Sequence, residues 1–337
     1  MDKKRSIGLV LSGGGGKGAY EVGVWRALDE YGITPNIGGV AGTSVGSLNA
    51  AMFAQGSCED AARIWSTISP SAVLTFDYLG VFKKLAMYVV LKLRRMPLPH
   101  LGKSIYDWAT GRQADQGLFS KKGLSELIDR AITPAGIHSF GGPVYVTVFQ
   151  LNGCKPVYHD LRNSRTLDEI RQRLLASASI PVVYGKTKVD EELCWDGGLP
   201  GVGDNIPVKP LYNESFRTII VVHLSRDVPV DRSKFPDCRI IEIMPQEDLG
   251  NLVSGTLNFK ADRARQNIER GYRDAVAVLE PIFSMGQSLN RIHRSMADLG
   301  ANAAAAAEEG RRMNEKTDKN IRQIDDLLQQ LDERGMD

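Results

Sequence analysis

One serine stands where a chain can present a nucleophile. Ser44 lies between Gly42 and Gly46 in a G-x-S-x-G pattern, after an apolar segment (36–41) and before a small-residue segment (47–54). A strand that turns sharply into a helix crowds its backbone, and glycines at the flanking positions relieve the clash. The pattern therefore predicts a catalytic serine near the positive end of a helix. A strand–helix corner with a serine cap is the plainer alternative.

A glycine loop precedes this serine. Residues 7–11 predict a buried strand, residues from about 19 a helix that stops at Gly32, and residues 36–41 a second strand, which together form a βαβ unit. Between the first strand and the helix lie Gly13, Gly14, Gly15, Gly16, Lys17 and Gly18.

Three chemistries use such a loop. A Walker A loop requires Ser or Thr after its Gly-Lys pair, but Gly18 follows Lys17. Gly13, Gly15 and Gly18 fit a dinucleotide fingerprint, yet the second strand ends without the acidic residue that would hold a ribose, so this alternative is disfavoured. Consecutive glycine N–H groups can instead form an oxyanion hole. Parallel strands end at one edge of a sheet, so this interpretation brings the loop to Ser44.

An aspartate closes a later predicted strand. Asp196 is followed by Gly197 and Gly198, which indicates a carboxylate at a tight, open turn, although a plain β-turn would have the same sequence. The small-residue segment 176–181 follows a helix predicted from Thr166 and allows the helix end to approach another element closely.

The remaining strands and helices fit an α/β protein. Residues 144–150 and 155–160 predict a hairpin, 218–224 and 239–244 predict buried strands, and 58–68 and 118–132 predict helices. A long helix is expected over 256–279, broken at Pro281. The segment 281–337 is helical in pattern and predicts an appendage, a self-association element or a partner-binding helix.

Composition limits the class of protein. The net charge of +2 gives no reason to expect a nucleic-acid partner. The cysteines lie far apart without neighbouring histidines, which argues against a zinc site or a disulfide framework: Cys58, Cys154, Cys194 and Cys238. No apolar segment has the length of a membrane span, so we expect a cytoplasmic protein, with peripheral membrane contact as an option. Residues 70–117 mix apolar and basic side chains and predict a cap, either solvated or facing an anionic lipid surface.

Taken together, the three motifs resemble the patatin-like phospholipase family. Its G-G-G-x-[KR]-G loop matches residues 13–18, its G-T-S-x-G elbow matches 42–46, and its D-G-[GA] motif matches 196–198. The small-residue run ending at Pro181 also looks like the family's, and the resemblance covers about residues 5–280. It implies a three-layer α/β/α fold around a mainly parallel sheet. The helical C-terminal extension, 281–337, lies outside the resemblance and is predicted from its own residue pattern.

The resemblance also implies a mechanism. Ser44 would attack an acyl ester of a phospholipid or lysophospholipid, with Asp196 as general base and the Gly13–Gly16 loop as oxyanion hole. Supporting positions would be Lys17, Gly18, Gly42, Gly46, Gly197 and Gly198, with no metal and no cofactor. His223 leaves open a Ser-Asp-His order, but that arrangement places its oxyanion glycines much further ahead of the serine. A catalytically latent scaffold that acts through the C-terminal helices is the alternative function.

Overall fold

The computed structural model describes residues 6–68, 121–181, 183–226 and 228–334, so the predicted cap at 70–117 lies outside the described residues. Contacts between residues divide the chain into one unit of residues 1–278 and a second of residues 279–337. The first unit contains every motif considered above.

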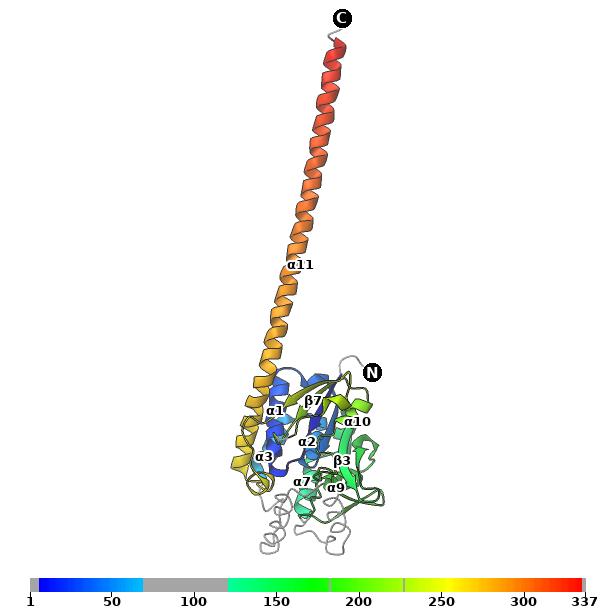
Figure 1. Ribbon diagram of the computed structural model, residues 1–337, viewed down its shortest axis with the longest axis vertical. Helices are drawn as coiled ribbons and strands as arrows, with labels where there is room; N and C mark the ends of the chain where they lie inside the picture. Colours follow the sequence, from blue (N-terminus) through cyan, green and yellow to red (C-terminus); the bar gives the residue numbers. More distant parts are fainter. Residues whose placement is uncertain (1–5, 69–120, 182, 227, 335–337) are drawn as a thin grey trace. The chain divides into compact units, whose positions relative to one another are not determined.

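A single mixed sheet forms the centre of the first unit (Figure 1). Its order is β5-β6-β3-β2-β1-β7-β8, with β4 paired to β3. The pairs among β1, β2, β3, β7 and β8 are parallel, whereas β4, β5 and β6 pair antiparallel. The strands are β1 (Ile7–Leu11), β2 (Ile37–Thr43), β3 (Val144–Gln150), β4 (Lys155–Asp160), β5 (Thr187–Val189), β6 (Glu192–Asp196), β7 (Thr218–Val222) and β8 (Arg239–Ile243).

Helices flank this sheet, and the predicted α/β architecture with a mainly parallel sheet is confirmed. The helices are α1 (Ala19–Glu30), α2 (Val45–Gln55), α3 (Cys58–Thr67), α7 (Lys122–Ala131), α8 (Pro134–Ser139), α9 (Leu167–Ser177), α10 (Val208–Asn213) and α11 (Ala261–Arg334). Shorter turns are η1 (Gly15–Gly18), η2 (Thr34–Asn36), η4 (Leu161–Asn163), η5 (Arg232–Lys234) and the π-helix η6 (Leu252–Thr256).

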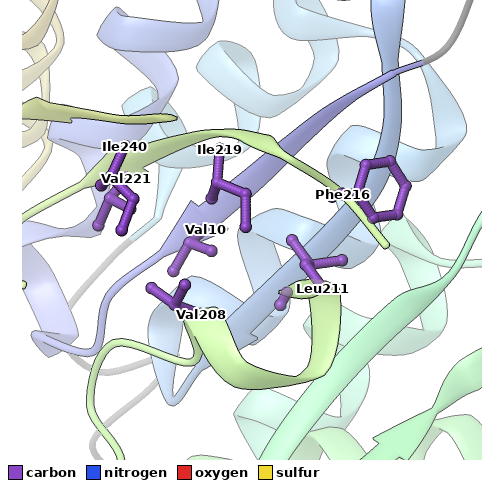
Figure 2. Close-up of a cluster of buried hydrophobic side chains, with 8 residues drawn as sticks. Val10, Val208, Leu211, Phe216, Ile219, Val221 and Ile240 are labelled. Carbon is purple, nitrogen blue, oxygen red and sulfur yellow. The ribbon is translucent and has the colours of Figure 1, made fainter. Parts of the chain in front are cut away.

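The strands are apolar on both faces because helices cover both. On one face, Val10 of β1 packs with Ile219 and Val221 of β7 against Val208 and Leu211 of α10 (Figure 2). On the other face, the alternate residues Leu9, Leu11 and Val222 pack with side chains of α1 and α2. Because both faces are buried, the sequences of the parallel strands are continuous apolar segments and do not alternate between apolar and polar residues.

The ends of β2 and β6 meet on β3. One edge of β3 pairs with β4 along residues 145–150. On its other edge β2 pairs with 144–147 and β6 with 148–150. Because β2 is parallel to β3 and β6 is antiparallel, the two strands run toward each other and their ends meet, Thr43 opposite Thr147 and Asp196 opposite Val148. This topology brings the residues that follow Thr43 next to Asp196.

The predicted hairpin is confirmed. β3 and β4 pair from Gln150–Lys155 to Tyr145–Asp160.

The long helix differs from its prediction. α11 begins at Ala261, after η6, and continues through Pro281, so the predicted break at that proline is wrong. A proline removes one hydrogen bond from a helix, but its fixed φ is itself helical. Long stretches of helix-forming residues on both sides offset that loss.

Candidate active site

Ser44 occupies a strained corner between β2 and α2. Its backbone has φ 56° and ψ −124°, a region that residues with a side chain rarely enter. A Cβ on Gly42 would lie 2.2 Å from the Gly46 carbonyl oxygen, and a Cβ on Gly46 would lie 2.3 Å from the Leu11 carbonyl oxygen. Only glycine therefore fits at either flank. A strained residue of this kind costs about 1–3 kcal/mol and is held by its surroundings.

Hydrogen bonds from α9 and α2 hold this corner. The Ser44 N–H donates to Ser177 Oγ over 2.8 Å, and the Ser177 hydroxyl donates to the Thr147 carbonyl of β3 over 2.6 Å. The Ser47 hydroxyl donates to the Ser44 carbonyl over 2.6 Å. Sequence reasoning gave Ser177 no such role; its only signal was the small-residue segment at the end of α9.

Replacing Ser177 tests this support. In Ser177→Ala the Ser44 N–H loses its buried acceptor, a loss of about 1–3 kcal/mol. If Ser44 is a nucleophile, we expect kcat of the reaction that it carries to fall about 10- to 100-fold with KM nearly unchanged. Ser164→Ala is the matched control, because it removes a buried hydroxyl that accepts a hydrogen bond from Arg173 instead. Equal kinetics for the two variants would show that Ser177 does not position Ser44.

Asp196 is fixed at the end of β6. Its N–H donates to the Ser179 carbonyl over 2.9 Å, and its Oδ1 accepts from the Gly198 N–H over 2.7 Å. A Cβ on Gly197 would lie 2.4 Å from the Thr147 carbonyl oxygen, so this glycine permits close approach to β3. The Asp-Gly-Gly sequence thus forms a carboxylate-presenting turn, as predicted, rather than the turn of a two-stranded hairpin.

The Asp196 carboxyl group is buried next to Ser44. Each of the two residues is only 5% exposed. Burial raises the pKa of Asp196 to about 6, and the Ser44 hydroxyl and the Gly198 N–H oppose this rise. Oδ2 makes no hydrogen bond of ordinary length and angle within the described residues, although the Ser44 hydroxyl lies close enough to act on the carboxyl group. The carboxyl group therefore has one anchored oxygen and one that can take a proton.

The glycine loop lies between β1 and α1 against η6. Gly15 has φ 57°, and a Cβ there would lie 2.2 Å from the Thr256 carbonyl oxygen. The Gly13 N–H donates to the Asn205 carbonyl over 3.3 Å, and Asn205 Nδ2 donates to the Gly13 carbonyl over 3.3 Å.

The N–H groups of the next three glycines differ from that of Gly13 in their hydrogen bonding. Across the described part of the chain, no hydrogen bond engages the N–H of Gly14, Gly15 or Gly16. These N–H groups stand at the start of η1, where a helical turn leaves its donors without partners.

A buried polar network anchors the far end of this loop. Asn49 Nδ2 donates to the Gly18 carbonyl over 2.9 Å and to Glu21 Oε2 over 2.6 Å, and Trp65 Nε1 donates to Asn49 Oδ1 over 3.0 Å. Burial raises the pKa of Glu21, which favours its neutral form. A Cβ on Gly18 would lie 2.5 Å from Val45 Cγ2, so the loop packs directly on the first residue of α2.

An apolar cavity opens onto Ser44 and Gly15. The side chains that line it include Val45, Leu48, Met52, Ile64, Trp65 and Leu124. They come from α2, α3 and α7. A cavity of this composition suits a hydrocarbon chain.

His223 has a different partner from the one a Ser-Asp-His triad requires. Its Nε2 lies 3.0 Å from Glu242 Oε2, and Arg232 bonds to the other oxygen of the same carboxylate. Burial lowers the pKa of His223 despite the attraction of Glu242. The imidazole is thus engaged between β7 and β8 in a neutral form.

A mainly parallel sheet, a serine at a strained strand–helix corner, a buried carboxyl group beside it and a glycine loop make up the arrangement expected of an α/β serine hydrolase. The patatin-like phospholipase family model matches residues 9–212, which is more than half of the chain. The chain therefore belongs to the patatin-like phospholipase family.

Curated relatives share a short segment with the chain. Lysophospholipase nte1 of Aspergillus terreus is 51% identical over 51 residues, which is 15% of this chain and 3% of that protein. A patatin-like phospholipase domain-containing protein of Caenorhabditis elegans is 56% identical over 50 residues, 15% of this chain and 4% of that protein. The matches are local, so they do not extend to the whole of either relative.

Solved structures give a weak match. VipD from Legionella pneumophila has a TM-score of 0.47 and 15% identity, covering 82% of this chain and 67% of that chain. Human GIVD cytosolic phospholipase A2 has a TM-score of 0.36 and 12% identity, covering 84% and 60%. The family assignment accordingly rests on the family model. In the described ranges, no helix is both long and apolar enough to span a membrane.

Proposed function

We propose that residues 5–280 form a serine acyl hydrolase that cleaves fatty-acyl esters of phospholipids or lysophospholipids. The observation that carries the proposal is the placement of Ser44 beside the buried Asp196 carboxyl group, where the ends of β2 and β6 meet. The family and the apolar cavity at Ser44 support the choice of a lipid ester. The name lysophospholipase, printed for the Aspergillus relative, supports the same choice.

The first half of the reaction forms an acyl-enzyme. Ser44 Oγ attacks the ester carbonyl carbon while its proton passes to Asp196 Oδ2, the carboxylate oxygen that has no hydrogen-bond partner among the described residues. The carbonyl electrons move onto oxygen, and the N–H groups of Gly14, Gly15 and Gly16 stabilise that oxyanion. Collapse breaks the ester bond, and the departing alcohol takes the proton from Asp196.

The second half releases the fatty acid. Asp196 removes a proton from water, and the resulting nucleophile attacks the Ser44 ester. Collapse of this second intermediate returns the proton to Ser44 Oγ and frees the acid. In this scheme Gly13 positions the loop through Asn205, because its own N–H is already bonded. Lys17 and Gly18 hold the end of the loop, and the scheme uses no metal or cofactor.

The raised pKa of Asp196 gives the reaction a pH dependence. The base must be ionised, so activity should be lost as the pH falls through about 6, the pKa of the buried carboxyl group. We expect kcat/KM for an uncharged ester to rise tenfold per pH unit below that point and to level off above it. A profile that stays flat down to pH 4.5 would contradict the assignment of Asp196 as the base.

The direct test of the function is fatty-acid release from phospholipid vesicles and from lysophospholipid micelles. We expect release from at least one of them with a chelator present, and the relative rates would rank the substrates. A membrane-surface contact of the segment 70–117 would appear as faster release from anionic vesicles. No release from any lipid ester would favour the alternative, a latent scaffold that acts through its C-terminal helix.

A further inference from the structure

The last part of α11 carries an apolar stripe of unusual regularity. From Ile282 to Leu331, positions spaced alternately three and four residues apart hold Ile, Leu, Met, Ala, Gly, Thr or Asn and no charged residue. The whole span belongs to one continuous helix (Figure 1). An average spacing of 3.5 residues, kept over seven heptads, is the repeat of a left-handed coiled coil.

Several apolar side chains of the stripe, among those the structure describes, are open to solvent. Its exposed apolar side chains include Met285, Ile292, Met296, Leu299 and Met313, each more than half exposed. A helix with such a stripe buries it against another helix in a coiled coil.

The charges along this helix fit an identical partner. On the positions that flank the stripe, residues 286 to 330 contain only Glu309 and Lys316 as carboxylate and ammonium groups. The other charged residues lie on the opposite face, where Arg311 and Arg312 pair with Glu308 of the same helix. Two copies can therefore meet along the stripe without repulsion between like charges.

We propose that this helix forms an antiparallel coiled-coil dimer with a second copy of the chain. The register that aligns Leu299 with the partner's Ile324 also aligns Gly310 with the partner's Met313. In the central layers each small residue of one helix then faces a larger residue of the other. The same register sets Glu309 opposite the partner's Lys316, and the two-fold symmetry repeats this pair. The overlap, residues 292–331, is about 60 Å long at the rise of an α-helix.

A parallel dimer fits the same sequence less well. It would stack Ala303, Ala306 and Gly310 each on its own copy, so three neighbouring layers would hold only small side chains. Such layers leave space, because the larger Leu299 and Met313 on either side hold the two helices apart. Glu309 would then approach the partner's Asn314 rather than a lysine.

Sedimentation of the full chain over a range of concentrations tests the dimer. We expect a reversible monomer–dimer equilibrium that Leu299→Asp weakens by at least about 100-fold, because each dimer would bury two charges without partners. Ala301→Asp, on the outward face of the same helix, is the matched control and should leave the equilibrium unchanged. A chain that stays monomeric at all concentrations, or a dimer insensitive to Leu299→Asp, would overturn the proposal.

Charge reversal tests the orientation. Glu309→Lys and Lys316→Glu should each weaken the dimer about 10-fold, and the double variant should restore it, since two exposed pairs change sign together. In a chain with Leu299→Cys and Ile324→Cys, oxidation should link residue 299 of one copy to residue 324 of the other. A bond between the two residues 299, or no rescue in the double charge variant, would overturn the antiparallel arrangement.

Discussion

Ser44→Ala should abolish ester hydrolysis and leave the fold intact. The hydroxyl is the proposed nucleophile, so the variant lacks the atom that forms the acyl-enzyme, and we expect kcat/KM to fall at least about 10⁴-fold. The change removes one oxygen and leaves the Ser44 N–H bonded to Ser177. Stability should therefore stay close to that of the wild type in thermal unfolding.

Ser139→Ala provides the matched control. Ser139 is exposed on α8, where its hydroxyl donates to the Gly136 carbonyl of the same helix. We expect wild-type kinetics from this variant. Turnover by Ser44→Ala within tenfold of the control would remove Ser44 from the mechanism.

Asp196→Asn should reduce turnover about 10³-fold, because an amide cannot accept the serine proton and general-base catalysis contributes about 10²- to 10⁴-fold. The inflection near pH 6 should disappear from the residual activity.

The same variant, Asp196→Asn, should unfold at a higher temperature than the wild type above pH 6. The native state raises this carboxyl pKa from 3.8 to about 6, so ionisation opposes folding by at most about 3 kcal/mol.

The pH dependence of this stability change distinguishes the loss of a buried charge from a general structural effect of the substitution. Below about pH 4 the carboxyl group is protonated in both states, so the gain from Asp196→Asn should vanish there. Asp237→Asn is the matched control, because Asp237 is exposed at φ 61°, a conformation that asparagine tolerates. A pH-independent change in stability, or activity equal to that control, would contradict the account of Asp196.

The parts of the site that follow from local backbone chemistry could be predicted from the sequence. Gly42 and Gly46 mark the strained corner because each faces a backbone carbonyl at about 2 Å from where a Cβ would stand. The positive φ of Gly15 is likewise a conformation that glycine adopts without strain. Strand β7 and helix α2 carry apolar patterns strong enough to locate them.

The supports of the site depend on contacts between distant segments, which no local pattern specifies. Ser177 lies 133 residues from the N–H that it accepts, and Asn205 lies 192 residues from the carbonyl to which it donates. The meeting of β2 and β6 follows from strand order, which the sequence left open. β5 and α10 have three and six residues, too short to show a period. The helix continues through Pro281 because the long helical segments on both sides offset the one lost hydrogen bond, which the residue type alone does not indicate.

The most direct measurement maps the covalent adduct of a serine-reactive fluorophosphonate on the full chain. Such a reagent captures a hydroxyl that a neighbouring base activates and an oxyanion hole supports. The account predicts one added mass on the peptide that contains Ser44, lost in Ser44→Ala and formed much more slowly in Asp196→Asn. An adduct on another serine, or labelling of Ser44 at an equal rate without the Asp196 carboxylate, would contradict the proposed Ser44–Asp196 dyad.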